Sequence, residues 1–142
     1  MNIEVVYYTK TGHTEKFAKA VAEVCGVRAN NIVEPHVLGD VDCLFIGTGI
    51  YGGKPAPELF KYIDELPVNR IKHAVIFSSS FTAKDQTELL INNLRAKGIE
   101  VHSRRFVSTG SFLFLKRKRP NTSDLERVRA YTAKVLKELG GN

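Results

Sequence analysis

Apolar residues form short continuous runs that alternate with stretches of helical spacing. The runs are typical of buried strands and predict strands at Ile3–Tyr8, Cys43–Ile46, Ala74–Ser78 and Ile99–Val107. A weaker strand is predicted at Asn31–Leu38. We expect it at an edge of the sheet because Pro35 cannot donate a hydrogen bond to a neighbouring strand.

Four further segments carry apolar stripes at a spacing of three and four residues. They predict helices at Thr14–Cys25, Pro57–Leu66, Ala83–Lys97 and Ser123–Leu139. Gly98 is a suitable stop for the third helix, and Ser123 with Glu126 predicts a capping box at the start of the last. Strands alternating with helices predict an α/β fold with one doubly wound parallel sheet, formed by residues 1–142 as a single domain.

Such sheets bind ligands at the carboxyl ends of their strands. Three of the predicted strands end in turns of small polar residues, at Thr9–Thr14, Thr48–Gly53 and Ser78–Thr82. We therefore expect the ligand site where these three turns meet.

The first turn has the features of a phosphate site. It joins a strand to a helix start, where unpaired N–H groups and the helix dipole attract anions, and Thr9, Thr11 and Thr14 add hydroxyls. Helix capping alone is the other interpretation, but one threonine would suffice for it. Neither G-x-G-x-x-G nor G-K-[ST] is present, which favours a monophosphate.

The turn T-K-T-G-H-T matches [ST]-x-[ST]-G-x-T, the phosphate-loop pattern of flavodoxins, and the chain resembles that family. G-T-G-I-Y-G-G and S-S-S-F-T resemble the two loops that flank the flavin, and R-P-N-T-S-D-L-E-R-V-R resembles the entry to the final helix. The resemblance covers essentially the whole chain and points to the short-chain class. It implies a three-layer flavodoxin-like sandwich of five strands in the order 2-1-3-4-5, with FMN as cofactor.

The resemblance also assigns roles to residues. The phosphate would be held by Thr9, Lys10 (through its backbone amide), Thr11, Gly12, His13 and Thr14, and the ring would be lined by Thr48, Gly49, Ile50, Tyr51, Gly52 and Gly53 and flanked by Ser78, Ser79, Ser80 and Phe81. Tyr51 is the best candidate for stacking on the flavin, while Phe81 either covers the other face or packs into the core. The Gly52–Gly53 peptide could flip toward the flavin, and His13 stands where relatives often have Asn.

Composition fits a globular protein: 43% of residues are apolar and 25% charged, and no apolar stretch reaches membrane-spanning length. The N-terminal strand does not resemble a secretory signal, and Cys25 and Cys43 are isolated. We expect a cytoplasmic protein with no membrane insertion.

Charge is distributed unevenly. Residues 1–70 hold 7 Lys+Arg and 9 Asp+Glu, whereas residues 71–142 hold 14 and 6, and the chain has a net charge of +6. Because typical flavodoxins are acidic, we expect a less negative flavin reduction potential here. A basic face would suit a redox partner with an acidic docking surface, and it comprises Arg104, Arg105, Lys116, Arg117, Lys118 and Arg119. A solvated loop is the alternative, and nucleic-acid binding is disfavoured because no aromatic residues are interleaved with the basic ones.

Neither a nucleophile–base pair nor a metal cluster is evident, so we predict no catalytic residues and no metal. The cofactor would carry the chemistry. The leading hypothesis is a flavoprotein that shuttles electrons between redox partner proteins. The alternative is a small FMN-dependent oxidoreductase of the quinone or NAD(P)H reductase type. A receiver domain is disfavoured because the strand ends carry Thr9, Thr48 and Ser78 rather than carboxylates.

Overall fold

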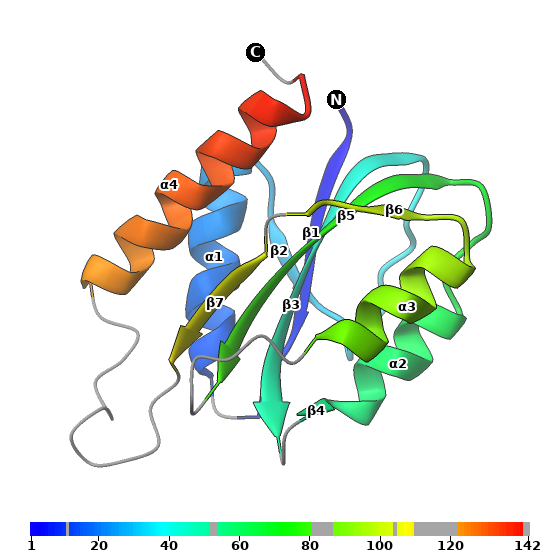
Figure 1. Cartoon of the computed structure of the whole chain (residues 1–142), viewed down its shortest axis with the longest axis horizontal. Coiled ribbons are helices and arrows are strands. Elements are labelled where there is room, and N and C mark those ends of the chain that lie inside the picture. Colours follow the sequence, from blue (N-terminus) through cyan, green and yellow to red (C-terminus); the bar gives the residue numbers. More distant parts are fainter. Residues whose placement is uncertain (11, 52–53, 81–86, 104, 110–121, 141–142) are drawn as a thin grey trace.

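A central parallel sheet organises the molecule (Figure 1). The computed structural model describes residues 1–10, 12–51, 54–80, 87–103, 105–109 and 122–140. The strand order is β2-β1-β3-β5-β6, and β7 also pairs with β5. The strands are β1 (Ile3–Tyr8), β2 (Ala29–Asn31), β3 (Val41–Tyr51), β5 (Ile71–Ser80), β6 (Glu100–Val101) and β7 (Phe106–Thr109), with a short β4 (Lys54–Pro55) antiparallel to β3.

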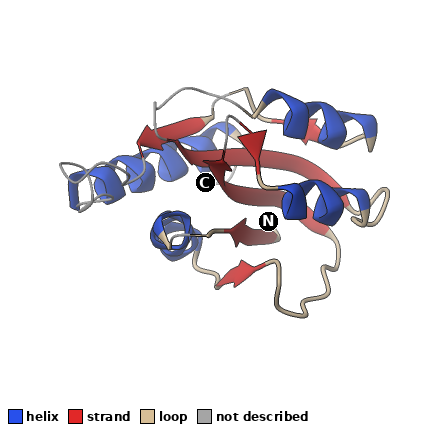
Figure 2. Ribbon diagram, turned by 90° about the horizontal axis from the view of Figure 1, so that it is seen from below, coloured by secondary structure: helices blue, strands red, loops and turns tan. Residues whose placement is uncertain are grey.

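Helices cover both faces of this sheet (Figures 1 and 2). The helices α1 (His13–Cys25) and α4 (Thr122–Glu138) lie on one face, and α2 (Pro57–Asp64) and α3 (Glu88–Ala96) on the other. Side chains along each strand alternate between the two layers. In β3, for example, Cys43 and Phe45 pack toward α1 and α4, and Leu44 and Ile46 pack toward α2 and α3. The predicted doubly wound α/β fold and its order of main strands are confirmed.

Two strand predictions need correction. Most of the predicted strand Asn31–Leu38 is irregular, since β2 ends at Asn31. The predicted strand Ile99–Val107 is divided into β6 and β7. From Ala74 to Phe77 β5 advances three residues, while the pairing segment advances five, from Val101 to Phe106. The two extra residues leave the ladder and split the strand.

The helix predictions differ from the structure mainly at their ends. The helix α2 ends at Asp64 rather than Leu66, and α3 begins at Glu88. The predicted stop at Gly98 is present, with a φ of 79° and an N–H that donates to the Arg95 carbonyl. The capping box is wrong as predicted, because α4 begins at Thr122 and Ser123 therefore lies inside its first turn.

Candidate functional site

The carboxyl ends of the long strands meet at one edge of the sheet. The register places Tyr8 beside Thr48, Thr48 beside Ser78, and Ser78 beside Val107. Residues 9–12 follow β1, residues 52–53 follow β3, and residues 81–86 follow β5 in the sequence. All three predicted turns therefore leave the same edge, which we call the carboxyl edge.

A hydrogen bond joins the residue after β1 to the N-cap residue of α1. Gly12 is the N-cap of α1 with a φ of 89°, a left-handed conformation that glycine adopts without strain, and as a glycine it supplies no side-chain cap itself. The Gly12 N–H donates to Oγ1 of Thr9 at 3.0 Å. The Thr14 side chain is only 1% exposed. A phosphate at this helix start would replace the Thr9 hydroxyl as the acceptor for Gly12.

His13 opens α1 and is half-buried. Burial, followed by the nearby Lys16 ammonium, lowers its pKa below the ordinary histidine value. The imidazole is therefore neutral near pH 7, and the helix end carries no additional charge from this residue.

Two consecutive tyrosines donate hydrogen bonds to acidic residues at this edge. The Tyr7 hydroxyl donates to Oε1 of Glu15, in the first turn of α1, and the Tyr8 hydroxyl donates to Oε2 of Glu58, in the first turn of α2, both at 2.9 Å. The bond from Tyr7 lowers the pKa of Glu15. Burial first, and then Glu15, raises the pKa of Tyr7 to about 12. Sequence reasoning missed both pairs, although consecutive tyrosines at a strand end point to opposite faces of the sheet.

The second turn is shorter than predicted. Thr48, Gly49, Ile50 and Tyr51 continue β3, and Ile50 pairs with Pro55 and Tyr51 with Lys54. Only two residues, Gly52 and Gly53, remain to join β3 to β4 in a hairpin. The strand continues because β3 is central and is paired on both sides, with β1 and β5.

The third turn also begins later than predicted, since Ser78, Ser79 and Ser80 end β5. Thr48 is buried and its hydroxyl donates to the Gly49 carbonyl at 2.7 Å. Ser78 is 2% exposed, and its Oγ has no hydrogen-bond partner among the residues that the structure describes. A buried hydroxyl without a partner is costly, so Ser78 is a polar group available for a ligand at this edge.

The structure describes only part of the remaining predicted residues. Thr11, Gly52, Gly53, Phe81, Arg104, Lys116, Arg117, Lys118 and Arg119 lie outside the described residues. Arg105 contacts Oε2 of Glu88 at 3.3 Å. Both cysteines are free thiols whose pKa values burial raises to about 12. Over the described ranges no group of histidine, cysteine or acidic residues could hold a metal ion.

In the part of the chain that the structure describes, no helix has the length and apolarity needed to cross a bilayer.

These features define a doubly wound α/β protein in which the first helix starts at the carboxyl edge of the sheet. The family model described as a flavodoxin domain matches residues 4–111. The chain therefore belongs to the flavodoxin family.

The similarity to known proteins extends over nearly the whole chain. An uncharacterized protein of Methanocaldococcus jannaschii, MJ0298, is 29% identical over 147 aligned positions, covering 94% of this chain and 97% of that protein. A flavodoxin from the domain Archaea has a TM-score of 0.74 at 17% identity and covers 99% of both chains. A WrbA-like flavodoxin from Agrobacterium tumefaciens has a TM-score of 0.72 at 22% identity, covering 97% of this chain and 96% of that one. A Fusobacterium nucleatum flavodoxin mutant bound to flavin mononucleotide has a TM-score of 0.68 at 14% identity and covers 96% of both chains.

Proposed function

We propose that this protein binds FMN at the carboxyl edge and transfers electrons between redox partner proteins. The observation that carries the proposal is the start of α1, where a left-handed glycine N-cap stands four residues after the end of β1, a strand paired on both sides. Membership of the flavodoxin family and the FMN bound by the Fusobacterium protein support the choice of ligand.

The residues present fit the group. The phosphate would accept hydrogen bonds from the N–H groups at the start of α1, with Gly12 exchanging the Thr9 hydroxyl for a phosphate oxygen. The hydrogen bonds from Tyr7 and Tyr8 hold the carboxylates of Glu15 and Glu58 in place, and the Lys19 ammonium, 3.4 Å from Glu15, partly offsets the charge of that carboxylate. The ring would lie along the β3–β4 hairpin and the end of β5, where Ser78 holds an unpartnered hydroxyl. When bound, FMN supplies the redox chemistry.

The first test is the absorption spectrum of the purified protein, followed by identification of the compound released on heating. We expect a two-band flavin spectrum and release of FMN. Protein without flavin should regain it from added FMN and should bind riboflavin, which lacks the phosphate, much more weakly. The proposal fails if the protein binds neither compound, and equal affinity for both would refute the phosphate role of the loop.

A second test separates an electron carrier from an oxidoreductase. The loaded carrier should be reduced by NAD(P)H only when a reductase protein is added. Rapid NAD(P)H oxidation by the protein alone, with or without a quinone, would favour the enzyme.

We further propose partners with acidic docking surfaces. The described cations near this edge include Lys16 and Lys54, both exposed. Glu88 partly offsets Arg105. Electron transfer to an acidic partner should slow as the salt concentration rises, because salt screens charge attraction between surfaces. A rate that increases with salt would exclude such a partner.

A further inference from the structure

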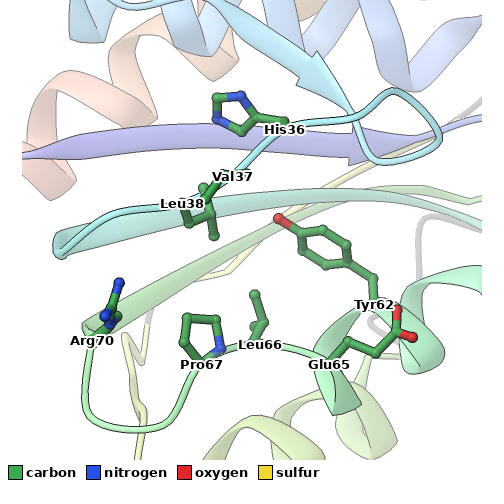
Figure 3. Close-up of a pocket in the computed structure, with 8 residues that line it drawn as sticks. All are labelled: His36, Val37, Leu38, Tyr62, Glu65, Leu66, Pro67 and Arg70. Carbon is green, nitrogen blue, oxygen red and sulfur yellow. The ribbon is translucent and has the colours of Figure 1, made fainter.

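A cavity lies at the edge of the sheet opposite the carboxyl edge (Figure 3). It has a volume of about 400 Å³ and is bounded by residues 36–38 on one side and by residues 62–70 on the other. Leu38 shortly precedes β3, and Arg70 directly precedes β5. The cavity is therefore at the amino ends of these strands, away from the edge that we assign to FMN. Its volume is within the range of small-molecule sites.

The walls of this amino-edge cavity are largely apolar. Leu38 and Leu66 belong to the buried core cluster, so the surrounding packing fixes their positions, and Pro67 continues the same wall. Val37 also lines the cavity, although its side chain is 91% exposed. A bound apolar group would cover part of Val37 and remove that surface from water.

Two polar groups at the cavity are available to a ligand. Figure 3 shows the Tyr62 hydroxyl pointing toward the Leu38 segment and the Arg70 side chain at the far end of the same space. Within the described residues, the Tyr62 hydroxyl has no hydrogen bond and the Arg70 guanidinium has no hydrogen bond or ion pair. Burial, followed by Glu4, raises the pKa of Tyr62 to about 12, so its hydroxyl remains a neutral donor.

The charges around the cavity are unequal at its two ends. Glu65 lies at the Tyr62 end, where its carboxylate repels an anion. His36, on the upper side, is occupied by Oε1 of Glu4 at 3.1 Å. Arg70 is thus the cation best placed to receive a negative group.

We propose that the amino-edge cavity binds a small aromatic carboxylate. The carboxylate pairs with Arg70, and the ring lies between Leu38 and the wall formed by Leu66 and Pro67. The Tyr62 hydroxyl donates to any acceptor on the far side of the ring. This site is separate from the proposed FMN site and does not depend on it.

The probe is 2-naphthoate, titrated into the full chain by calorimetry and followed through backbone amide shifts. We expect one saturable site, with shifts at Leu38, Leu66 and Arg70 and none in the loop after β1. Excess FMN should leave the affinity unchanged. The neutral isostere 2-naphthamide should bind roughly tenfold more weakly, because it cannot pair with the guanidinium.

Variants test the two polar groups. Arg70→Gln should weaken 2-naphthoate binding by roughly tenfold and Tyr62→Phe by about threefold, the size expected for losing an ion pair and one hydrogen bond. Arg28→Gln removes the same charge from an exposed position outside the cavity and should change nothing. Absence of saturable binding, competition by FMN, equal binding of 2-naphthamide, or an equal effect of Arg28→Gln would each overturn the proposal. The 2-naphthamide comparison needs no variant and stands even if Arg70→Gln does not fold.

Discussion

Gly47 lies where two central strands meet, and we expect a single methyl group there to be costly. Its register partner is Phe77 in β5. A Cβ built on Gly47 would lie 2.3 Å from Cε2 and 2.5 Å from Cζ of the Phe77 ring. Ordinary contact begins at 3.4 Å, so the ring would have to retreat by about 1 Å. Phe77 is fully buried against α1 and α4, which leaves little room for that movement.

Overpacking of this kind costs about 1–3 kcal/mol. For a chain of this length, Gly47→Ala should therefore lower the melting temperature by roughly 3–10 °C. FMN affinity should fall as well, because Gly47 precedes Thr48 and Phe77 precedes Ser78 at the carboxyl edge. Urea unfolding and FMN titration measure the two effects.

Two variants make this reasoning refutable. Gly39→Ala is the matched control, because a Cβ at Gly39 meets no atom within 4 Å, and it should leave stability unchanged. Phe77→Leu should relieve the clash, so adding Gly47→Ala to it should cost less than adding Gly47→Ala to the wild type. The explanation is wrong if Gly47→Ala costs less than about 0.5 kcal/mol, or if the two substitutions are additive within that margin.

Three further outcomes follow from the carboxyl edge. The folded-state pKa of His13 is lowered, so the stability that this residue contributes is present above the ordinary histidine pKa and is lost as pH falls through the folded value. In urea unfolding, the wild type should therefore lose more stability than His13→Asn between pH 7.5 and pH 5. Parallel losses in the two proteins would contradict this. Tyr7→Phe should lower the free energy of unfolding in urea by about 1 kcal/mol, more than Tyr8→Phe does, because the Tyr7–Glu15 hydrogen bond is the more buried of the two. Equal losses would argue against burial as the cause. Lys54→Gln should make the reduction potential of bound FMN more negative, because a nearby cation favours the reduced anion. Lys134→Gln on α4 should leave the potential unchanged. Equal shifts for both variants in a redox titration would show that only net charge matters.

The apolar pattern was sufficient to predict a doubly wound α/β fold, whereas the strand order followed from the resemblance to flavodoxins. Continuous apolar runs gave the strand β1 with its exact limits and located β3 and β5, because both faces of these strands are buried. Helical stripes located the four helices in the same way. The apolar pattern did not indicate how far each strand is extended by hydrogen bonding to its neighbours. The central strand β3 runs through Gly47, Thr48 and Gly49, residues typical of turns, because β1 and β5 hydrogen-bond to it on both sides.

The Asn31–Leu38 prediction failed for a local reason. Val33 and Val37 resemble strand residues, but the Val33 N–H donates to Oδ1 of Asn31 at 3.2 Å and the Glu34 N–H donates to the Asn31 carbonyl at 3.0 Å. These bonds form a turn in which the asparagine side chain takes the place of a strand partner. Because β2 is an edge strand paired only with β1 in the described part of the chain, no strand there on its other side holds the following residues in an extended conformation.

The candidate site was predictable in part. The spacing of threonines and glycine located the loop after β1, since the motif is local, but the roles assigned to its residues stay predictions. The amino-edge cavity was not predictable, because Leu38, Tyr62 and Arg70 are far apart in the sequence and converge only through the ends of α2, β3 and β5. Neither could the sequence show that the Thr9 hydroxyl already occupies the Gly12 N–H.

The carboxyl edge also reconciles two opposing requirements. An acidic residue in the first turn of a helix stabilises the helix through its dipole, and both α1 and α2 have one, Glu15 and Glu58. The same negative charge opposes a phosphate. The tyrosines at the end of β1 do not remove this charge: each donates a hydrogen bond that holds one carboxylate in place, on opposite faces of the sheet, and each bond favours the ionised form. At the start of α1 the Lys19 ammonium lies 3.4 Å from Oε2 of Glu15, so a cation rather than the tyrosine offsets the negative charge that an anion would meet there.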